Sequence, residues 1–297
     1  MRRKSLWAIA SIVAVLLGMS TVTAQTRNSA AEAAAKKSLE AFITAWNTGE
    51  NASLRKAMNF PFVTVGGGAT TIANEPEDFS TDFDRMRQRE GWARSSFDFD
   101  SYAVNKSSAE KVHCEIDFSR FQADGTRYLK GRVMYIVTNQ NGHWAPQMRS
   151  PAVGTAPLGQ QQRAEALAGA RQAVLDFFTA FNAADTEGTT RHLNYPHVFM
   201  TLGGGFALAE DSSSRSVRPD FQRMRANQKW HTSTIDSLEA SSVAASKVHM
   251  ELVFSRWHPD GTRYWTVPAL WLVTRVGDRW GIQLRSLMPA TFSDLSD

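Results

Sequence analysis

Seven titratable and aromatic residues between positions 192 and 231, in the second half of the sequence, form the first candidate site. His197 and Tyr195 are the catalytic candidates. A histidine titrates near pH ~6.5 and can accept and return a proton, and a tyrosine hydroxyl can donate to a developing oxyanion. Residues expected to bind a substrate beside them are Trp230, Arg223, Asp220, His192 and His231. In this hypothesis the indole stacks on an aromatic ring and the guanidinium anchors an acidic group. The alternative interpretation leaves Tyr195 and Trp230 in the core and the histidines in solvent.

A second set of polar residues occurs twice, at a constant spacing of 136 residues: His113, Glu115, Gln147 and Arg149, and again His249, Glu251, Gln283 and Arg285. Alternation with apolar residues predicts that each set lies on one face of a sheet, opposite an apolar face that ends in Phe118 or Phe254. A His-Glu pair near an Arg could perform acid-base chemistry. The two sets could instead meet where two sheets pack about a pseudo-twofold axis. The interface interpretation is favoured, because the apolar face is the one that helices should cover.

Motifs for metal, phosphate and common hydrolase chemistry are missing from the sequence. His-x-Glu recurs at 113–115 and 249–251, but two residues on one strand are fewer than the three or four ligands that zinc needs. The Gly-Gly-Gly runs lack the Lys-Ser/Thr of a phosphate loop, and Gly-x-Ser-x-Gly does not occur. The single cysteine, Cys114, excludes an intramolecular disulfide. We therefore expect neither a metal nor a cofactor.

These candidate residues belong to a unit that the sequence contains twice. The matches keep one order over about 120 residues: Phe83 to Arg87 returns as Phe221 to Arg225, Lys111 to His113 as Lys247 to His249, and Asp124 to Tyr128 as Asp260 to Tyr264. We expect a first domain over 30–151, a linker rich in Pro, Gly and Gln over 152–162, and a second domain over 163–290.

Each copy is expected to begin with helices and to end in strands. Aromatic stripes with i, i+3, i+4, i+7 spacing predict a first helix, carrying Phe42 and Trp46 or Phe177 and Phe181. A shorter helix should end at Asn59-Phe60-Pro61 or Asn194-Tyr195-Pro196, because the residue before a proline avoids the helical region. A short strand, a third helix and an antiparallel meander with Asp-Gly turns should follow. This order predicts an α+β fold.

The two copies differ around the catalytic candidates. Phe60 stands where the second copy has Tyr195, and a deletion after Pro61 leaves His197 without a counterpart. Duplicated units often keep one working site, so we expect the second copy to carry the working pocket and the first to be mainly structural.

The N-terminus has the pattern of an export signal. Arg2, Arg3 and Lys4 precede an apolar run of 14 residues, and Val22-Thr23-Ala24 offers a cleavage site, which predicts a signal peptide over 1–24 and a periplasmic or secreted protein. Without those three cations the chain has 30 basic and 29 acidic residues. We therefore expect no nucleic-acid partner, and no membrane contact after signal cleavage.

The motifs Ala-Trp-Asn-Thr-Gly-Glu and Ala-Phe-Asn-Ala-Ala-Asp, the Asp-Gly hairpins and a closing strand with Trp-x-x-Gln resemble the nuclear transport factor 2-like superfamily, in particular its polyketide-cyclase and ketosteroid-isomerase branch. The resemblance covers nearly the whole chain after residue 24, as two tandem copies. It implies that each copy is a cone, in which helices pack on a curved antiparallel sheet around an apolar pocket. It also implies that the two sheets pair as a pseudo-dimer within the chain.

The sequence departs from the ketosteroid isomerases at their catalytic positions. Their general-base Asp would fall at Val65-Gly66-Gly67 or Leu202-Gly203-Gly204, and their neutral acid near Met134 or Leu270, which cannot donate a proton. Their mechanism is therefore not expected here. Two functions stay open: a cofactor-independent lyase, isomerase or hydrolase acting on a small apolar or aromatic molecule, and a non-catalytic exported binding or scaffold module.

Overall fold

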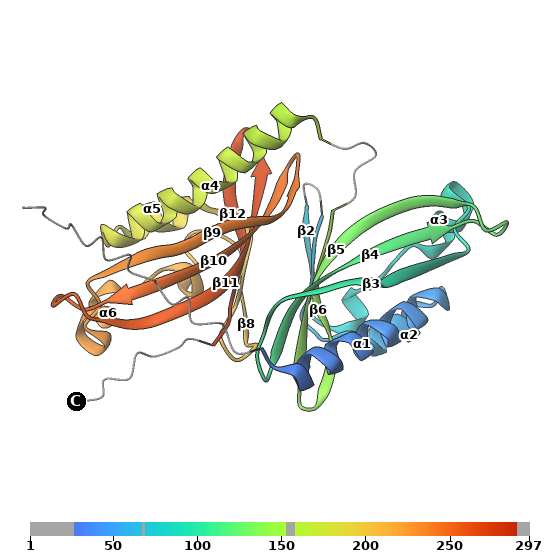
Figure 1. Cartoon of the computed structure of the whole chain (residues 1–297), viewed down its shortest axis with the longest axis horizontal. Helices are drawn as coiled ribbons and strands as arrows, with labels where there is room; N and C mark the ends of the chain where they lie inside the picture. Colours follow the sequence, from blue (N-terminus) through green and yellow to red (C-terminus); the bar gives the residue numbers. More distant parts are fainter. Residues whose placement is uncertain (1–26, 67–68, 153–157, 290–297) are drawn as a thin grey trace, which may run out of the picture.

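The computed structural model describes residues 27–66, 69–152 and 158–289. Within these ranges the chain forms two six-stranded sheets, each with its own helices, so the α+β fold in two tandem copies is confirmed. Figure 1 shows the copies as two lobes side by side, with the two sheets adjacent in the middle. The expected signal peptide and part of the expected linker lie outside the described residues.

The first copy contains three α-helices and a mixed sheet. The helices are α1 (Ser29–Asn47), α2 (Asn51–Lys56) and α3 (Phe83–Glu90), with a 3-10 turn, η1, at Pro76–Asp78. The strands are β1 (Phe62–Val65), β2 (Thr70–Ala73), β3 (Arg94–Ser107), β4 (Lys111–Phe121), β5 (Arg127–Gln140) and β6 (His143–Ala152). They lie in the order β2-β1-β6-β5-β4-β3, and only the β1–β6 pair is parallel.

The second copy repeats this arrangement. Its helices are α4 (Gln160–Asn182), α5 (Thr186–Arg191) and α6 (Phe221–Gln228), with η2 at Arg215–Val217. Its strands are β7 (Leu193–Met200), β8 (Phe206–Ala209), β9 (Thr232–Ala244), β10 (Lys247–Trp257), β11 (Arg263–Val276) and β12 (Arg279–Leu287). Their order is β8-β7-β12-β11-β10-β9, and β7 pairs in parallel with β12.

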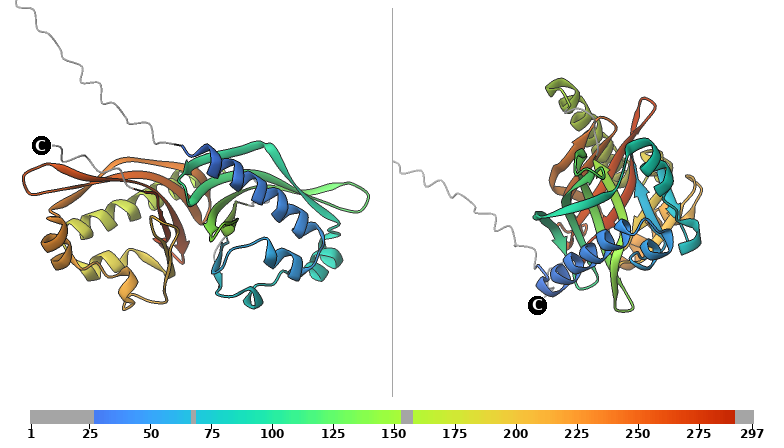
Figure 2. Two further views of the ribbon diagram at one scale, coloured as in Figure 1. Left: turned by 90° about the horizontal axis from the view of Figure 1, so that it is seen from below. Right: turned by 90° about the vertical axis from the view of Figure 1, so that its right-hand side faces the viewer.

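The long helix of each copy packs its aromatic stripe on one face of its own sheet. Phe42 and Trp46 of α1 lie in a core with the alternate residues Val112, Cys114 and Ile116 of β4. Residues of α4, β10 and β11 form the matching core of the second copy. Figure 2 shows each sheet curving over its helices, which is the cone that the resemblance implies. We call this side of each sheet the cone face.

The second helix of each copy is shorter than predicted. Helix α2 ends at Lys56 and α5 at Arg191, and Pro196 lies inside β7. The chain is already in the sheet at Leu193, which is level with Ile282 of β12. Pairing with β12 therefore ends the helix several residues before the proline could.

The other faces of the two sheets pack against each other. The apolar part of this contact consists of the same five positions from each copy: Val63, Val65, Met134, Ile136 and Met148, and Val198, Met200, Leu270, Leu272 and Leu284. This pairing of equivalent residues makes the chain a pseudo-dimer. No helix within the described residues is long and apolar enough to cross a membrane.

Candidate functional site

The first copy encloses a cavity of about 240 Å³ between its helices and the cone face of its sheet. Aromatic and aliphatic side chains form most of the wall, and the polar groups come from β1, β3, β4, β5 and β6. We call it the first-copy cavity. Its lining residues are Phe42, Ile43, Trp46, Thr64, Ser95, Phe97, Phe118, Arg120, Leu129, Val133, Tyr135, Arg149 and Pro151.

Arg149 contributes one of the two guanidinium groups of this cavity. It is level with Tyr135 of β5 on one side and with Thr64 of β1 on the other, so all three side chains project from the cone face. Its Nε donates to Thr64 Oγ1 at 3.1 Å, and its Cζ lies 5.4 Å from the centre of the Trp46 ring. No carboxylate within the described ranges forms an ion pair with it. Burial lowers the pKa of Arg149.

Tyr135 and Arg120 supply the other ionisable groups of the wall. The Tyr135 hydroxyl has no hydrogen-bond partner in the part of the chain that the structure describes. Burial raises the pKa of Tyr135, so the phenol stays protonated at neutral pH. Its hydroxyl can therefore donate a hydrogen bond to an anion. Arg120 is already paired, because its Nη1 lies 3.0 Å from Glu90 Oε2.

The equivalent space in the second copy is smaller, about 80 Å³. Larger side chains take the places of three wall residues: Trp271 that of Tyr135, Phe199 that of Thr64, and Phe178 that of Ile43. Trp271 stacks on Phe178 with their ring centres 5.5 Å apart. The second cone is therefore mostly filled by its own aromatic side chains.

Arg285 stands where the first copy has Arg149, but it has a partner. Its Nε donates to Nε2 of His197 at 3.1 Å, and Nδ1 of His197 lies 2.9 Å from the carbonyl oxygen of Ile282. This pattern assigns the proton to Nδ1 and makes Nε2 the acceptor. Burial and the neighbouring guanidinium hold the pKa of His197 well below its usual range, and burial lowers that of Arg285 to about 10.

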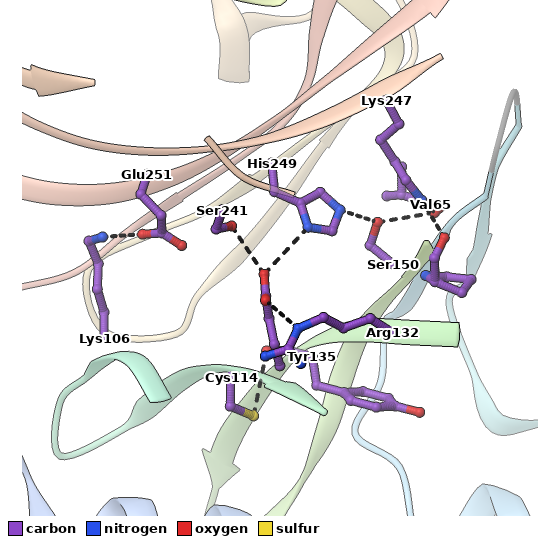
Figure 3. Close-up of polar contacts among 12 residues, drawn as sticks. Val65, Lys106, Cys114, Arg132, Tyr135, Ser150, Ser241, Lys247, His249 and Glu251 are labelled. Atoms are coloured by element: carbon purple, nitrogen blue, oxygen red, sulfur yellow. Dashed lines mark hydrogen bonds and ion pairs between the residues drawn. The ribbon is translucent and has the colours of Figure 1, made fainter. Parts of the chain in front are cut away.

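A polar layer lies between the two sheets, on the faces opposite the cavities. His113 Nε2 is 2.9 Å from Ser286 Oγ, and His249 Nε2 is 2.8 Å from Ser150 Oγ. The pKa of both histidines is lowered by burial. Figure 3 shows His249 meeting Ser150, and Glu251 meeting Lys106, from opposite copies.

The glutamates of this layer have different partners. Glu115 accepts from Arg132 Nε at 2.9 Å within its own copy and from Ser241 Oγ at 3.0 Å across the contact. Burial opposes the charge of Glu115, but these donors and the nearby His249 outweigh it and lower the pKa. Glu251 pairs with Lys106, yet burial raises its pKa.

Two buried lysines complete the layer by bonding to carbonyl groups of the opposite copy. Lys111 Nζ donates to the carbonyl oxygens of Thr201 and Leu287, at 2.7 and 2.6 Å. Lys247 Nζ donates to those of Val65 and Pro151, at 2.6 and 2.9 Å (Figure 3). Burial lowers the pKa of each lysine to about 7.

Comparison with known proteins gives similarity to solved structures. A cystatin-like protein of unknown function from Nostoc punctiforme is 13% identical, with 44% of this chain and 96% of that chain covered and a TM-score of 0.37. An NTF-2-like protein of unknown function from Shewanella oneidensis is 11% identical, with 40% and 97% covered and a TM-score of 0.32. An NTF2-like protein from Novosphingobium aromaticivorans is 13% identical, with 48% and 94% covered and a TM-score of 0.37.

Each of these matches covers about half of this chain and nearly all of the other protein. The matched proteins are described as NTF2-like or as having a cystatin-like fold. No family model matches the sequence, and neither does any curated protein.

The structure does not bring the seven residues of the first candidate site, between positions 192 and 231, together around a cavity. His197 is fully buried and Trp230 is 2% exposed, with its Nε1 donating to Ser233 Oγ. Trp230 therefore lies in the core, as the alternative interpretation has it, whereas His197 is buried and neither faces a cavity nor lies in solvent. The Tyr195 hydroxyl donates to the carbonyl of Thr190 at 2.9 Å.

The other four members of that group lie apart from the second cavity as well. Asp220 caps α6 by accepting from the backbone N–H of Arg223, whose side chain is exposed. His231 is exposed and His192 is half-buried, with its pKa lowered by burial. None of the seven belongs to the lining of the second cavity, which runs from Phe177 on α4 to Leu287 on β12.

The repeated polar sets divide between three environments. His113, Glu115, His249 and Glu251 lie in the layer between the sheets, the place that the interface interpretation describes. Gln147 and Gln283 bond within their own copies, to Thr138 and Thr274. Arg149 and Arg285 point into the cones, so the expectation of one shared face is wrong for them. The register is the reason, because His113 is level with Ile136 and through it with Met148, not with Arg149.

The second copy was expected to carry the working pocket, but the larger of the two cone cavities lies in the first copy. Sequence reasoning missed Tyr135 and Thr64, although the difference between Tyr135 and Trp271 was visible in the repeat. Met134 and Leu270 face the other sheet, so the cavity-facing neighbour is Tyr135. Among the described residues, no group of three or more His, Cys, Asp or Glu could hold a metal ion.

Proposed function

We propose that this protein is an exported small-molecule-binding protein, and that the first-copy cavity holds one small apolar or aromatic compound. The main support is the cavity of about 240 Å³, which has a mostly aromatic wall and a few converging polar groups. A buried apolar cavity of about 150 Å³ holds a benzene molecule. The first-copy cavity thus has room for one ring with a short substituent.

Binding has more support than catalysis. The ionisable side chains of the wall are Tyr135, Arg120 and Arg149, and none of them is a base near neutral pH. A lyase, isomerase or hydrolase that uses acid-base chemistry needs a proton acceptor within reach of its substrate. His197, the acceptor expected from the sequence, lies in the other copy with both ring nitrogens in hydrogen bonds.

The second copy then acts as a scaffold. Its cone is packed with aromatic side chains, and its sheet covers the back of the sheet that forms the first-copy cavity. Export rests on the N-terminal pattern of Arg2, Arg3 and Lys4 followed by an apolar run. Fractionation of cells that express the full chain tests it. A mature protein shortened by 24 residues outside the cytoplasm is expected, and a full-length cytoplasmic protein would contradict export.

Native mass spectrometry of the exported protein tests the binding function. One retained small molecule per chain is expected. Calorimetry with a panel of single-ring compounds, both neutral and acidic, provides the second measurement, with one site per chain as the expected stoichiometry. An empty protein that also binds no member of the panel would refute the proposal.

A further inference from the structure

Arg149 is a half-buried arginine of the sheets whose charge no described carboxylate balances, a property that Arg256 and Arg285 of the second copy share. Arg132 pairs with Glu115 and Asp117, and Arg120 pairs with Glu90. Arg149 uses one of its five N–H donors, on Thr64 Oγ1, and no carboxylate of the described residues meets the rest. Leaving a buried charge without a counter-ion is costly, so this arrangement favours a negative group in the cavity.

The surroundings of the guanidinium hold it in place for such a group. Its Cζ lies 5.4 Å from the ring centre of Trp46, 5.9 Å from that of Phe62 and 5.7 Å from that of Phe79. Cation-π contacts of this kind orient a guanidinium without neutralising its charge. The remaining N–H donors thus stay available on the side of the cavity.

Tyr135 adds a second donor next to the guanidinium. The two residues are level on adjacent strands of the cone face, and the hydroxyl has no partner in the described part of the chain. A neutral phenol beside a cation can donate to a carboxylate oxygen while the planar guanidinium bonds to the other. Because Arg120 is neutralised by Glu90, the cavity has one uncompensated positive charge and suits a monoanion better than a phosphate dianion.

In the second copy, protein groups surround the arginine equivalent to Arg149. There Arg285 has His197 as a neutral acceptor, and Phe177 and Phe199 lie within 5.1 and 5.0 Å of its Cζ. Trp271 stands at the position of Tyr135, so the second copy has no hydroxyl there and the larger indole fills the space. The same arginine is thus satisfied by protein groups in one copy and left facing an open cavity in the other.

We propose that the first-copy cavity binds a carboxylic acid with a single ring, with Arg149 and Tyr135 holding the carboxylate and the aromatic wall holding the ring. This inference rests on the proposed binding function and names its ligand class. It makes Arg149 a specificity-determining residue, since a neutral ring compound would leave the guanidinium unpaired.

Calorimetry with matched acids and amides tests this assignment on the full chain at neutral pH. Benzoate and phenylacetate are compared with benzamide and phenylacetamide, which keep the ring and lose the charge. The wild-type protein should prefer each acid over its amide by about tenfold to hundredfold, the usual effect of charge-assisted hydrogen bonds. Arg149→Gln should abolish that preference, and Tyr135→Phe should reduce it.

Arg285→Gln is the matched control, because it removes the equivalent arginine from the filled cone and should leave the preference unchanged. Equal binding of acids and amides by the wild type would overturn the carboxylate assignment while leaving the binding function intact. An acid preference that survives Arg149→Gln would overturn it as well. Failure of all four compounds to bind would overturn the assigned ligand class, and it would refute the binding function as well if the exported protein also retains no small molecule. Tyr135→Phe keeps the test decisive if Arg149→Gln does not fold.

Discussion

His249 of the second copy and Ser150 of the first share a hydrogen bond of 2.8 Å in the layer between the two sheets. Ser150 Oγ donates to the carbonyl of Val65 at 3.3 Å, so it accepts the proton of His249 Nε2. His113 and Ser286 make the corresponding contact with the roles of the copies exchanged. The two contacts join the sheets at equivalent positions on either side of the pseudo-twofold axis.

His249→Ala should therefore destabilise the whole chain. The change leaves a buried hydroxyl without its donor and opens a space between the sheets, which typically costs about 1–3 kcal/mol. Urea denaturation measures the effect. His231→Ala is the control, since that side chain is exposed and should stay within about 0.5 kcal/mol of the wild type. Equal stability of the two variants would contradict the role of the polar layer.

Stability should rise with pH between about 7 and 10.5 because of Lys111 and Lys247. Burial lowers the pKa of each from 10.5 to about 7, so in this range the unfolded chain binds more protons than the folded one. Each lysine contributes up to about 1.4 kcal/mol per pH unit. Below pH ~7 both states are protonated and the cost of burying the charge is fully present. Denaturation at pH 7.5 and 9.5 measures the slope, and Lys111→Met with Lys247→Met should flatten it. An unchanged slope in the double variant would contradict the prediction.

Tyr135→Trp should close the first-copy cavity. The equivalent residue in the second copy is Trp271, and the space there is about 80 Å³ instead of 240 Å³. Affinity for single-ring compounds should fall by about tenfold or more, equivalent to 1.4 kcal/mol. Tyr135→Phe separates the loss of the hydroxyl from the gain in volume, and Trp271→Tyr should leave binding in the first copy unchanged. Wild-type affinity in Tyr135→Trp would show that the ligand binds elsewhere.

His197→Ala should cost stability and leave ligand binding intact. The imidazole is fully buried and is the only hydrogen-bond acceptor of Arg285 among the described residues, so its removal strands a buried charge. A loss of about 1.5–3 kcal/mol is expected from denaturation, the usual value for a buried hydrogen bond to a charged group. Calorimetry on the folded variant should give the wild-type affinity. A stable His197→Ala variant that no longer binds the ligand would restore this histidine as a functional residue.

The two-copy organisation could be predicted because the same residue motifs occur twice in the sequence. Alternation along β4 also correctly placed His113 and Cys114 on opposite faces of the sheet. The faces of β6 and β12 could not be predicted in the same way. Which residue of β6 is level with His113 depends on the turns and on a register shift between Ile136 and Val137, and neither leaves a pattern in the sequence. The sequence therefore predicts Arg149 as a candidate residue but on the wrong face of the sheet, with His113 instead of on the cone face.

The difference between the two cavities was beyond sequence reasoning for another reason. It arises from side-chain volumes at positions on different elements, such as Thr64 and Phe199, or Ile43 and Phe178, whose proximity only the folded sheet establishes. The start of β7 at Leu193 also had to be known before His197 could be placed against β12 instead of at an open end.

Both partners of the sheet contact belong to one polypeptide, so their association is unimolecular and does not weaken on dilution. In a homodimer every substitution would appear twice, once on each side of the axis. Covalent fusion removes that constraint. Glu251 faces Lys106 while Glu115 faces Ser241, and one cone is filled while the other is open. The two halves of this molecule were free to diverge from each other, so the proposed binding function can use one open cone, where a symmetric dimer would have two.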